Sequence, residues 1–573
     1  MRKLLVYLKE YTLDCVLGPL FKLREASFEL MVPLVMASII DTGIVSGDRG
    51  YITRMCVILV ALGLVGFVCA IVAQYFAAKA SVGFAAKLRH ALFSHIQKLS
   101  FTELDTAGTS TFITRMTSDI NQVQNGMNLT LRLLLRSPFV VFGAMVMAFT
   151  IDWKAALVFA GVIPLLSIVV FGVMLWTMPR YKQVQSHLDR VLNVTRENLT
   201  GVRVIRAFGK EIAEEKRFEE TNESLTGLQL FVGKVSALMN PVTYVLINLA
   251  TVLVIWVGGR QVDRGVITQG QVVALLNYMA QILVELIKLA NLIINITKSL
   301  ACANRAQAVL EIPSSLTSPE NGGQGEDGSV VFENAGLTYK GAGGESLSGL
   351  SFAVQPGQTV GVIGGTGSGK SSLINLIPRF YDVTEGTVTV GGKDVREWDL
   401  PALRDAIGVV PQRAVLFTGT IRENLLWGKE DATEEELWQA LRVAQAEDFV
   451  REKPKGLDEP VAQGGRNFSG GQRQRLTIAR ALVKAPKVLI LDDSASALDF
   501  ATDLKLRTAI KNMPSYPTVF IVSQRTSSVR HADLIIVLED GEAAGMGTHE
   551  ELLESCEIYR EIYESQFRGE GAE

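Results

Sequence analysis

The sequence predicts a multi-domain protein, in which an all-α transmembrane domain with six helices precedes an α/β domain of the P-loop type. Six apolar stretches crowd into the first half of the 573-residue chain, and a helix of roughly 20 mostly apolar residues can cross a bilayer. The second half alternates short apolar runs with glycine-rich turns, the pattern of a soluble α/β domain. One such run, Thr359–Ile363, leads directly into a glycine-rich loop that ends in lysine and serine.

Six segments are predicted to cross the membrane, with a large buried helical core as the alternative. Trp153, Trp176 and Trp256 stand at segment ends, which favours the membrane because tryptophan is enriched at its polar boundaries. The charged N-terminus is expected to lie as an amphipathic helix on the cytoplasmic membrane surface rather than to act as a signal peptide. The predicted spans are Phe28–Val45, Val57–Tyr75, Leu133–Thr150, Ala155–Trp176, Val242–Val257 and Val272–Ile296.

Two connections between spans, Phe76–Arg132 and Thr177–Pro241, are long and in places basic. The bias of positive charge toward the cytoplasm places both connections there, together with both chain termini. Their helical periodicity predicts helices that continue past the membrane and reverse near Asp105–Ser118 and Glu197–Lys210. Each turn carries an apolar patch that requires a partner surface. The patch residues are Phe112, Ile113, Val204, Ile205 and Phe208.

The sixth span has one polar face. At about 100° per residue, its polar side chains fall within an arc of about 120°. Such a face is costly against lipid, so it either joins helices together or lines a water-accessible pathway, and we favour the pathway. Glu285 and Lys288, three positions apart, are expected to pair. The stripe consists of Asn277, Gln281, Glu285, Lys288, Asn291 and Asn295.

Composition and charge limit which classes of protein the chain can belong to and where its domains divide. The net charge of −3 argues against a nucleic-acid partner. The five cysteines and five histidines form no metal-binding spacing, and the cysteines are expected to be reduced. A polar segment rich in proline, glycine and serine predicts a linker. The expected domains are residues 1–310 for the membrane part, 311–329 for the linker and 330–573 for the α/β part.

The glycine-rich loop predicts a site for ATP and Mg²⁺. Its glycines let backbone N–H groups turn toward phosphate oxygens at a helix N-terminus. Lys370 is expected to meet the β- and γ-phosphates, and Ser371 to place its hydroxyl on Mg²⁺. A second apolar run ends in Asp492, which is placed for the same magnesium shell. The loop consists of Gly364, Gly365, Thr366, Gly367, Ser368, Gly369, Lys370, Ser371 and Ser372.

The run Phe468–Arg475, F-S-G-G-Q-R-Q-R, closely resembles the signature sequence of ATP-binding-cassette (ABC) proteins. The resemblance covers essentially the whole chain and looks like the exporter branch, with coupling helices at the two turns. It implies that Tyr339 stacks on adenine, and that Gln412, in the Q-loop, joins the catalytic and metal-binding residues. It also implies that Asp499 belongs to the D-loop and that Gln524 holds the switch position.

In this family two cassettes pair head to tail, so the signature acts on the ATP of the partner chain. The resemblance therefore implies a second half-transporter as partner. The residues that would contact the partner's ATP are Ser469, Gly470, Gly471 and Gln472.

Two positions depart from the family pattern at the catalytic site. Asp493 follows the Walker B aspartate where a hydrolysing cassette has glutamate, and its shorter side chain sets the carboxylate back by roughly 1 Å, which can cost about 10²-fold in rate. Gln524 replaces the switch histidine and cannot titrate. Both act on the same phosphate, so this site is expected to hold ATP and hydrolyse it slowly. The loop Val461–Asn467 also lacks the family's G-E-R-G, which leaves its contact with the coupling helices open.

The leading hypothesis is a subunit of a heterodimeric ABC exporter in the cell (inner) membrane, with its ATPase domain in the cytoplasm. The resemblance allows drugs, lipids or peptides as cargo, and multidrug-type export is a family-level expectation. The alternative from another class is a nucleotide-gated regulatory or channel-like membrane protein with little ATP turnover. Six spans exclude a soluble ATPase, and the joining of membrane and ATPase domains in one chain disfavours an importer.

Overall fold

The computed structural model describes residues 2–319, 322–494 and 498–567. It divides into two compact units. The helical unit contains Met1–Gln97 and Ser110–Glu311, and the α/β unit contains Lys98–Thr109 and Ile312–Glu573. A short piece of the first long connection therefore belongs to the α/β unit.

The described residues include six helical stretches that are long and apolar enough to cross a membrane. Each predicted span falls on one of them, except that Val45 directly follows the first. The stretches are Lys3–Ile44, Arg49–Ile96, Thr109–Ile151, Trp153–Thr200, Glu211–Asp263 and Gln269–Leu310. The elements are η1 (Arg2–Tyr11), α1 (Thr12–Ser38), η2 (Ile39–Ile44), α2 (Arg49–Ile96), α3 (Phe101–Ala107), α4 (Thr109–Thr114), η3 (Arg115–Asp119), α5 (Ile120–Leu133), α6 (Arg136–Ile151), α7 (Trp153–Thr200), α8 (Val202–Ala207), α9 (Glu211–Asp263) and α10 (Gln269–Leu310).

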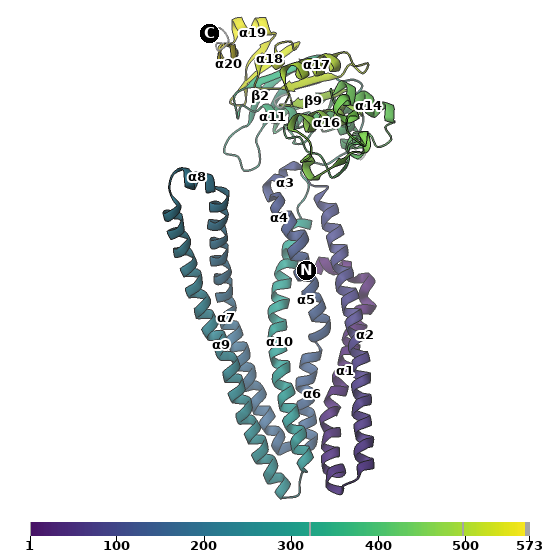
Figure 1. Ribbon diagram of the computed structural model, residues 1–573, viewed down its shortest axis with the longest axis vertical. Coiled ribbons are helices and arrows are strands. Elements are labelled where there is room, and N and C mark those ends of the chain that lie inside the picture. Colours follow the sequence, from purple (N-terminus) through teal and green to yellow (C-terminus); the bar gives the residue numbers. More distant parts are fainter. Residues whose placement is uncertain (1, 320–321, 495–497, 568–573) are drawn as a thin grey trace. The chain divides into compact units, whose positions relative to one another are not determined.

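Helices α7 and α9 are far longer than a membrane requires. They contain 48 and 53 residues, so each measures roughly 70–80 Å at 1.5 Å per residue, against a hydrocarbon core of about 30 Å. The two helices pack side by side, and α8 joins them at one end (Figure 1). Because α8 lies within Glu197–Lys210, the predicted reversal of the chain is confirmed there.

The first reversal begins earlier than predicted. Helix α3 starts in a capping box, in which Ser100 and Glu103 each bond the backbone of the other. It ends at Gly108, whose φ of +76° favours glycine. The prediction that Phe112 and Ile113 form the tip is therefore wrong: Phe112 is buried and belongs to the helical unit, and Ile113 is exposed in the same unit.

In the described part of the α/β unit, the central sheet has six strands in the order β12-β11-β3-β10-β9-β6. All of its neighbouring pairs are parallel except β11 with β12. An antiparallel sheet of order β2-β1-β4-β5 and the short pair β7-β8 accompany it. The strands are β1 (Val330–Leu337), β2 (Leu347–Val354), β3 (Thr359–Gly364), β4 (Glu385–Val390), β5 (Lys393–Asp394), β6 (Ile407–Val410), β7 (Gly419–Thr420), β8 (Pro460–Val461), β9 (Val488–Asp492), β10 (Thr518–Val522), β11 (Leu534–Glu539) and β12 (Glu542–Gly547).

Strands β3, β9 and β10 are almost wholly buried, as expected of parallel strands covered on both faces. Val522 of β10 lies beside Val362 of β3 and Asp492 of β9. The carboxyl ends of three strands therefore meet at one edge, where α/β sheets bind ligands. The helices of this unit are α11 (Lys370–Leu376), α12 (Leu400–Ala406), α13 (Ile421–Leu426), α14 (Glu434–Val443), α15 (Glu447–Arg451), α16 (Gly470–Leu482), α17 (Phe500–Lys511), α18 (Thr526–Val529), α19 (His549–Ser555) and α20 (Glu557–Phe567), with single turns η4 (Gly456–Asp458) and η5 (Gln463–Gly465).

Candidate active site

The phosphate-binding loop joins β3 to α11. Gly367 and Gly369 have φ of +86° and +96°, a region that side chains disfavour. A Cβ atom added to Gly365 or Gly367 would meet nothing within 4 Å, so the loop is open on the side where phosphate oxygens would approach. Lys370 Nζ donates to the carbonyl oxygens of Gly365 (2.5 Å) and Gly364 (3.0 Å), which folds the lysine back over the loop.

One pocket collects residues from the ends of three parallel strands. The loop after β3 supplies Lys370 and Ser371, the end of β9 supplies Asp492 and Asp493, and the end of β10 supplies Gln524. The full lining is Thr366, Gly367, Lys370, Ser371, Gln412, Asp492, Asp493, Val522, Ser523 and Gln524. The structure therefore brings together the predicted catalytic and metal-binding residues.

A second pocket lies along the same phosphate loop. Its lining is Glu345, Ser346, Gly367, Gly369, Lys370, Ser371, Ser372, Asp540 and Gly541. Three residues of the loop, Gly367, Lys370 and Ser371, line both pockets. The loop is therefore accessible from two sides.

The side chains at this edge fit a magnesium ion bound together with nucleotide phosphates. Ser371 Oγ donates to Asp492 Oδ2 at 3.4 Å, and Gln412 lines the same pocket. The described residues contain no group of three or more His, Cys, Asp or Glu that could hold a metal ion. Mg²⁺ is usually held by only a few protein ligands together with the phosphates of the substrate. Burial, and then the charge of Asp493, raise the pKa of Asp492. Both effects disfavour the charged carboxylate, and a bound cation would stabilise it.

Asp493 occupies a strained position directly after β9. Its φ of +45° is unusual for a residue with a side chain. Its backbone N–H donates to the carbonyl oxygen of Val522 at 3.0 Å, which ties the end of β9 to β10. Gln524 lies two positions after the end of β10, and its side chain is exposed. The backbone therefore holds both altered positions at the mouth of one pocket.

The signature residues form a different kind of surface. Ser469 caps α16: its N–H donates to Gln472 Oε1 (3.0 Å), and its Oγ accepts from the Gln472 N–H (3.2 Å). Phe468 is buried and anchors the turn, while Ser469 and Gly470 are exposed. The start of a 13-residue helix thus faces solvent, and a helix N-terminus favours anions. Neither pocket described above is lined by the residues Phe468–Gln472.

Two further predicted residues lie outside the strand-end pocket. Asp499 caps α17 by accepting from the N–H (2.9 Å) and hydroxyl (2.8 Å) of Thr502. The preceding D-loop residues Ser496 and Ala497 lie outside the described residues. Tyr339 follows β1, and its hydroxyl donates to Ser372 Oγ at 3.0 Å, which places its ring beside the phosphate loop.

A chain of aromatic contacts joins Tyr339 to α3 within the α/β unit. The rings of Tyr339 and Tyr381 meet edge-on at 5.0 Å, and the Tyr381 hydroxyl donates to Asp105 Oδ2 at 2.5 Å. The ring of Phe101 lies 4.8 Å from that of Phe380. Sequence reasoning missed these residues, although the capping pattern S-F-T-E at residues 100–103 marks the start of this helix.

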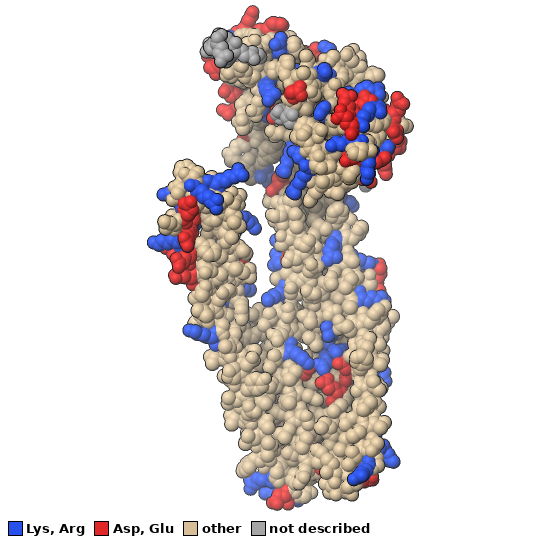
Figure 2. All heavy atoms as spheres, in the orientation of Figure 1, with Lys and Arg blue, Asp and Glu red and all other residues tan. Residues whose placement is uncertain are grey.

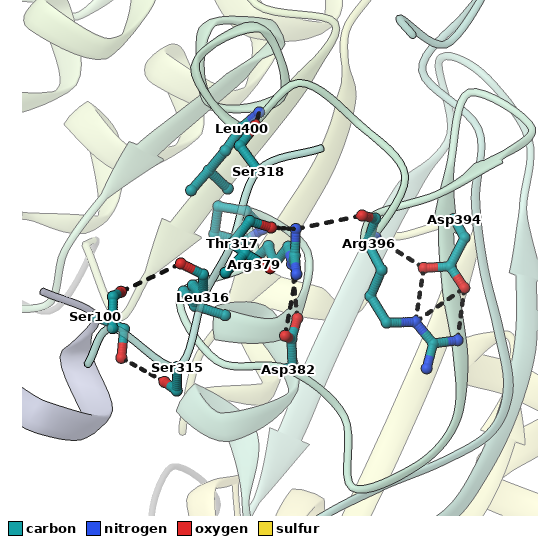
Figure 3. A network of polar contacts seen from close by, with 12 residues as sticks. Ser100, Ser315, Leu316, Thr317, Ser318, Arg379, Asp382, Asp394, Arg396 and Leu400 are labelled. Atoms are coloured by element: carbon teal, nitrogen blue, oxygen red, sulfur yellow. Dashed lines mark hydrogen bonds and ion pairs between the residues drawn. The ribbon is translucent and has the colours of Figure 1, made fainter. Parts of the chain in front are cut away.

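The segment after α10, at residues 315–318, contacts the part of the α/β unit that also contacts α3 (Figure 3). Arg379, which is 4% exposed, donates to the carbonyl oxygens of Thr317 (3.2 Å) and Arg396 (3.4 Å) and pairs with Asp382 (2.6 Å). The hydroxyls of Ser100 and Ser315 lie 2.7 Å apart. Residues of the predicted linker and the start of α3 are therefore attached to one surface of the α/β unit.

Charged side chains gather midway along the helical unit, where most surface atoms are uncharged (Figure 2). Glu285 pairs with Lys288 at 2.8 Å, as predicted. It also accepts from Arg136 Nη1 (2.5 Å) and Ser137 Oγ (2.9 Å) of α6. Arg136 Nη2 in turn donates to Glu29 of α1 at 2.6 Å. Sequence reasoning missed Arg136 and Glu29, although charges inside two predicted spans are a signal that they pair.

The polar stripe of α10 is unevenly buried. Glu285 is 3% exposed, Lys288 and Asn291 are exposed, and Asn277, Gln281 and Asn295 are half-buried. The amide oxygen of Gln281 is buried and has no hydrogen-bond partner among the described residues. Part of the stripe therefore joins helices, and part is open.

Comparisons with known proteins agree with this architecture. Residues 16–286 match the ABC transporter transmembrane region, and residues 347–496 match the ABC transporter family model. An uncharacterized ABC transporter ATP-binding protein of Mycobacterium tuberculosis is 40% identical over 547 residues, 94% of this chain and 93% of that protein. The chain therefore belongs to the ABC transporter family, as an exporter half-transporter that joins a six-helix transmembrane region to an ATP-binding domain.

Two relatives carry more specific names. An ATP-dependent lipid A-core flippase of Desulfotalea psychrophila is 34% identical over 480 residues, 83% of each chain. A probable multidrug resistance ABC transporter ATP-binding/permease protein of Bacillus subtilis is 34% identical over 485 residues, 84% of this chain and 82% of that protein. The fold is similar to that of a bacterial Atm1-family ABC exporter with ATP bound (TM-score 0.80, 23% identity, 99% of both chains).

Proposed function

We propose that this chain is one subunit of a heterodimeric exporter, whose own ATP site binds nucleotide and hydrolyses it slowly. The observation that carries the proposal is the pairing of Asp493 and Gln524 at the mouth of one pocket. Both residues differ from the hydrolysing pattern, and both would act on the γ-phosphate. The signature, by contrast, has an intact helix cap at Ser469, and Ser469 and Gly470 are exposed.

Each residue of the pocket has a proposed task. Lys370 neutralises the β- and γ-phosphates, Ser371 and Asp492 hold Mg²⁺ with help from Gln412, and Tyr339 stacks on adenine. Mg²⁺, when bound with ATP, supplies positive charge to the phosphate oxygens. Asp493 orients water less closely than a glutamate would, because its side chain is one methylene shorter. Gln524 donates a hydrogen bond to the γ-phosphate but carries no charge.

A partner chain is proposed to supply the second ATP site. Ser469 and Gly471 would face the ATP of a second half-transporter, whose own Walker B glutamate and switch histidine perform the rapid hydrolysis. We place the complex in the cell (inner) membrane, with the α/β unit and both termini in the cytoplasm. The relatives named as a lipid flippase and a multidrug transporter support lipids or drugs as cargo, with peptides also allowed.

The exposed part of the α10 stripe is proposed to line the transport pathway. Lys288 and Asn291 are exposed on α10, whereas Leu283 is 8% exposed. Single cysteines at these positions test the assignment with a membrane-impermeant thiol reagent. Reaction at positions 288 and 291 but not at 283 supports a wet pathway, whereas protection of all three would mean that the stripe only joins helices.

The heterodimer is tested by co-purification with a neighbouring half-transporter and by the ATPase rate of the assembly. The proposal requires that the mixed assembly hydrolyse ATP faster than this chain alone. Equal rates would contradict it. A nucleotide-gated regulatory or channel-like protein remains the second candidate, because two copies of this chain would contain two slow sites. That function predicts ATP-dependent opening or closing with little turnover and no partner.

A further inference from the structure

The backbone that carries Gln524 is held by a side chain from the last helix of the α/β unit. Gln566 of α20 donates from Nε2 to the carbonyl oxygen of Gln524 at 2.8 Å. Its Oε1 accepts from the backbone N–H and from the hydroxyl of Thr526, both at 2.9 Å. The chemistry fixes this orientation, because the Thr526 N–H needs an acceptor and the Gln524 carbonyl needs a donor. One carboxamide therefore spans the turn from Gln524 to Thr526.

Helix α20, which carries Gln566, is packed against the core of the α/β unit. Tyr559 is fully buried, and its hydroxyl lies 2.8 Å from His549 Nδ1 of α19. Ile558 and Ile562 pack against the core of the unit. The backbone of α20 is thus fixed by packing about one to two turns before Gln566, so the carboxamide is presented from an ordered helix.

A second side chain holds the other end of the same segment. Arg507 of α17 donates to the carbonyl oxygens of Ser527 (3.1 Å) and Ser528 (3.0 Å) and pairs with Asp503 at 2.7 Å. This contact fixes α18 but does not reach Gln524. The position of Gln524 itself depends on β10 before it, on the Arg525 N–H, which donates to Ser523 Oγ at 3.0 Å across it, and on Gln566 after it.

We propose that Gln566 is a positioning residue for the switch, which sets where the side chain of Gln524 enters the nucleotide pocket. The inference rests on the proposed contact of Gln524 with the γ-phosphate. The Gln524 side chain is exposed, so we expect its backbone to set where it lies. Because a hydrogen bond weakens steeply when its geometry departs from the ideal, a carboxamide that holds the Gln524 carbonyl controls how well ATP is retained.

Two substitutions separate the two arms of the carboxamide. Q566A removes both arms. Q566E keeps an acceptor for Thr526 but loses the donor to Gln524 and puts a carboxylate beside its carbonyl oxygen. S565A, one position earlier, is the matched control, since Ser565 is exposed and, among the described residues, its hydroxyl bonds only to the carbonyl oxygen of Ile562 of its own helix.

The experiment uses the full chain in its assembled transporter, with photoreactive 8-azido-ATP and Mg²⁺ as the probe. Loss of label from this chain after dilution into ATP measures retention. We expect Q566E and Q566A to release nucleotide about three- to tenfold faster, the size of one hydrogen bond's net contribution, because both lose the donor to Gln524, and S565A to match the parent. Hydrogen exchange should show the Thr526 amide protected in Q566E and unprotected in Q566A.

Unchanged retention in Q566E, with Thr526 still protected, would overturn the positioning role. A lower melting temperature in Q566A without faster release would also overturn it, because the contact would then only stabilise the fold. The proposed slow site is tested separately by the parent protein. If the label on this chain is hydrolysed as fast as the partner's, slow hydrolysis fails, while faster release in Q566E still supports positioning.

Discussion

The α/β unit presents two surfaces that we propose face nucleotide, and they are built in different ways. The phosphate side combines the ends of β3, β9 and β10. Lys370 therefore lies in the same pocket as Asp492 and Gln524, although it precedes both by more than a hundred residues in the sequence. The signature side is the start of one helix, in which Ser469 and Gln472 cap each other across three residues. One surface depends on long-range packing, and the other depends on a local hydrogen-bonding motif.

This difference explains how side chains on the phosphate side can be replaced while the signature side keeps its sequence. Asp493 and Gln524 stand at strand ends, where a side chain can be replaced without disturbing β9 or β10. The signature residues form the helix cap themselves, so their replacement would disturb the helix as well as the contact with ATP. A chain with the slow site that we propose would therefore keep the surface that we propose serves a partner.

The largest expected effect comes from damage to the signature side. Ser469→Arg places a long cation at the start of α16 and removes the cap. We expect the ATPase rate of the assembled transporter to fall by about 10²- to 10³-fold, the usual loss when a preorganised anion-stabilising group is removed. Steady-state phosphate release measures it. Ser555→Arg is the control, because Ser555 is exposed at the end of α19 and its hydroxyl donates to the carbonyl oxygen of Glu551 within that helix.

The same assay tests whether the two surfaces are truly unequal. Asp493→Ala should change the rate by less than about twofold, since the proposed function makes this chain's own site about 10²-fold slower than the partner's, and such a site contributes little to the total. If Asp493→Ala is as damaging as Ser469→Arg, this chain's own site carries the turnover, and the contrast between the two surfaces is lost.

A restored phosphate side should gain activity. Asp493→Glu combined with Gln524→His returns the longer carboxylate and the titratable ring to the pocket. In an assembly whose partner has its Walker B glutamate replaced by glutamine, we expect ATP turnover to rise by about 10²-fold. Each single change should give less, because both groups act on one phosphate. No gain in the double variant would show that other features of this chain keep the site slow.

Much of this comparison follows from the sequence, because the motifs that carry it are local. The loop at Lys370, the strand ending at Asp492 and the signature at Ser469 are contiguous patterns with their own physical signals. The helix span predictions also held, since apolar length is a property of a single segment. The sequence placed the first cytoplasmic tip too late, at Phe112, because the cap at Ser100 was not weighed.

Contacts between distant segments were beyond the sequence pattern. Gln566 lies 40 positions after Thr526 and has no special neighbours in the sequence. Arg136 meets Glu285 across 149 positions. Only the fold brings such side chains together. A charge inside a predicted span signals that it has a partner but not which one, and a lone glutamine signals none.

A change in the helical unit should leave both nucleotide-facing surfaces intact. Glu285 accepts from Arg136, Ser137 and Lys288, so Glu285→Gln leaves two cations facing a neutral amide. Removing one member of a buried ion pair typically costs about 3–5 kcal/mol. We therefore expect substrate transport to change several-fold, while ATP affinity stays that of the parent. Vesicle transport and nucleotide binding are measured together, with Val284→Ala, on an exposed side of α10, as the control.

A change in ATP affinity in Glu285→Gln equal to the change in transport would show that the effect extends beyond the helical unit. The two nucleotide-facing surfaces could then not be treated as independent of the charged cluster. An unchanged transport rate would instead mean that the pairing of Glu285 is structural.

The smallest expected effect is a pH dependence confined to the phosphate side. Burial, and then the charge of Arg530, lower the pKa of His549, while Glu550 opposes the shift. His549 also faces Tyr559 and Tyr563 of α20. Since its native pKa lies below the ordinary value of about 6.5, the unfolded or opened state binds the proton first. The stability from this contact is complete above about pH 6.5 and is lost as the pH falls toward the native pKa.

Acid should therefore loosen α20, and through Gln566 the turn at Gln524, but not the helix that begins at Gly470. Hydrogen exchange at pH 7.5 and 5.5, corrected for intrinsic rates, should show lost protection in α18 and unchanged protection in α16. His549→Gln keeps a hydrogen-bonding group for Tyr559 and does not titrate, so it should abolish the difference. If both helices lose protection alike, or if the variant behaves as the parent does, acid acts on the whole unit, and the phosphate side has no separate support from α20.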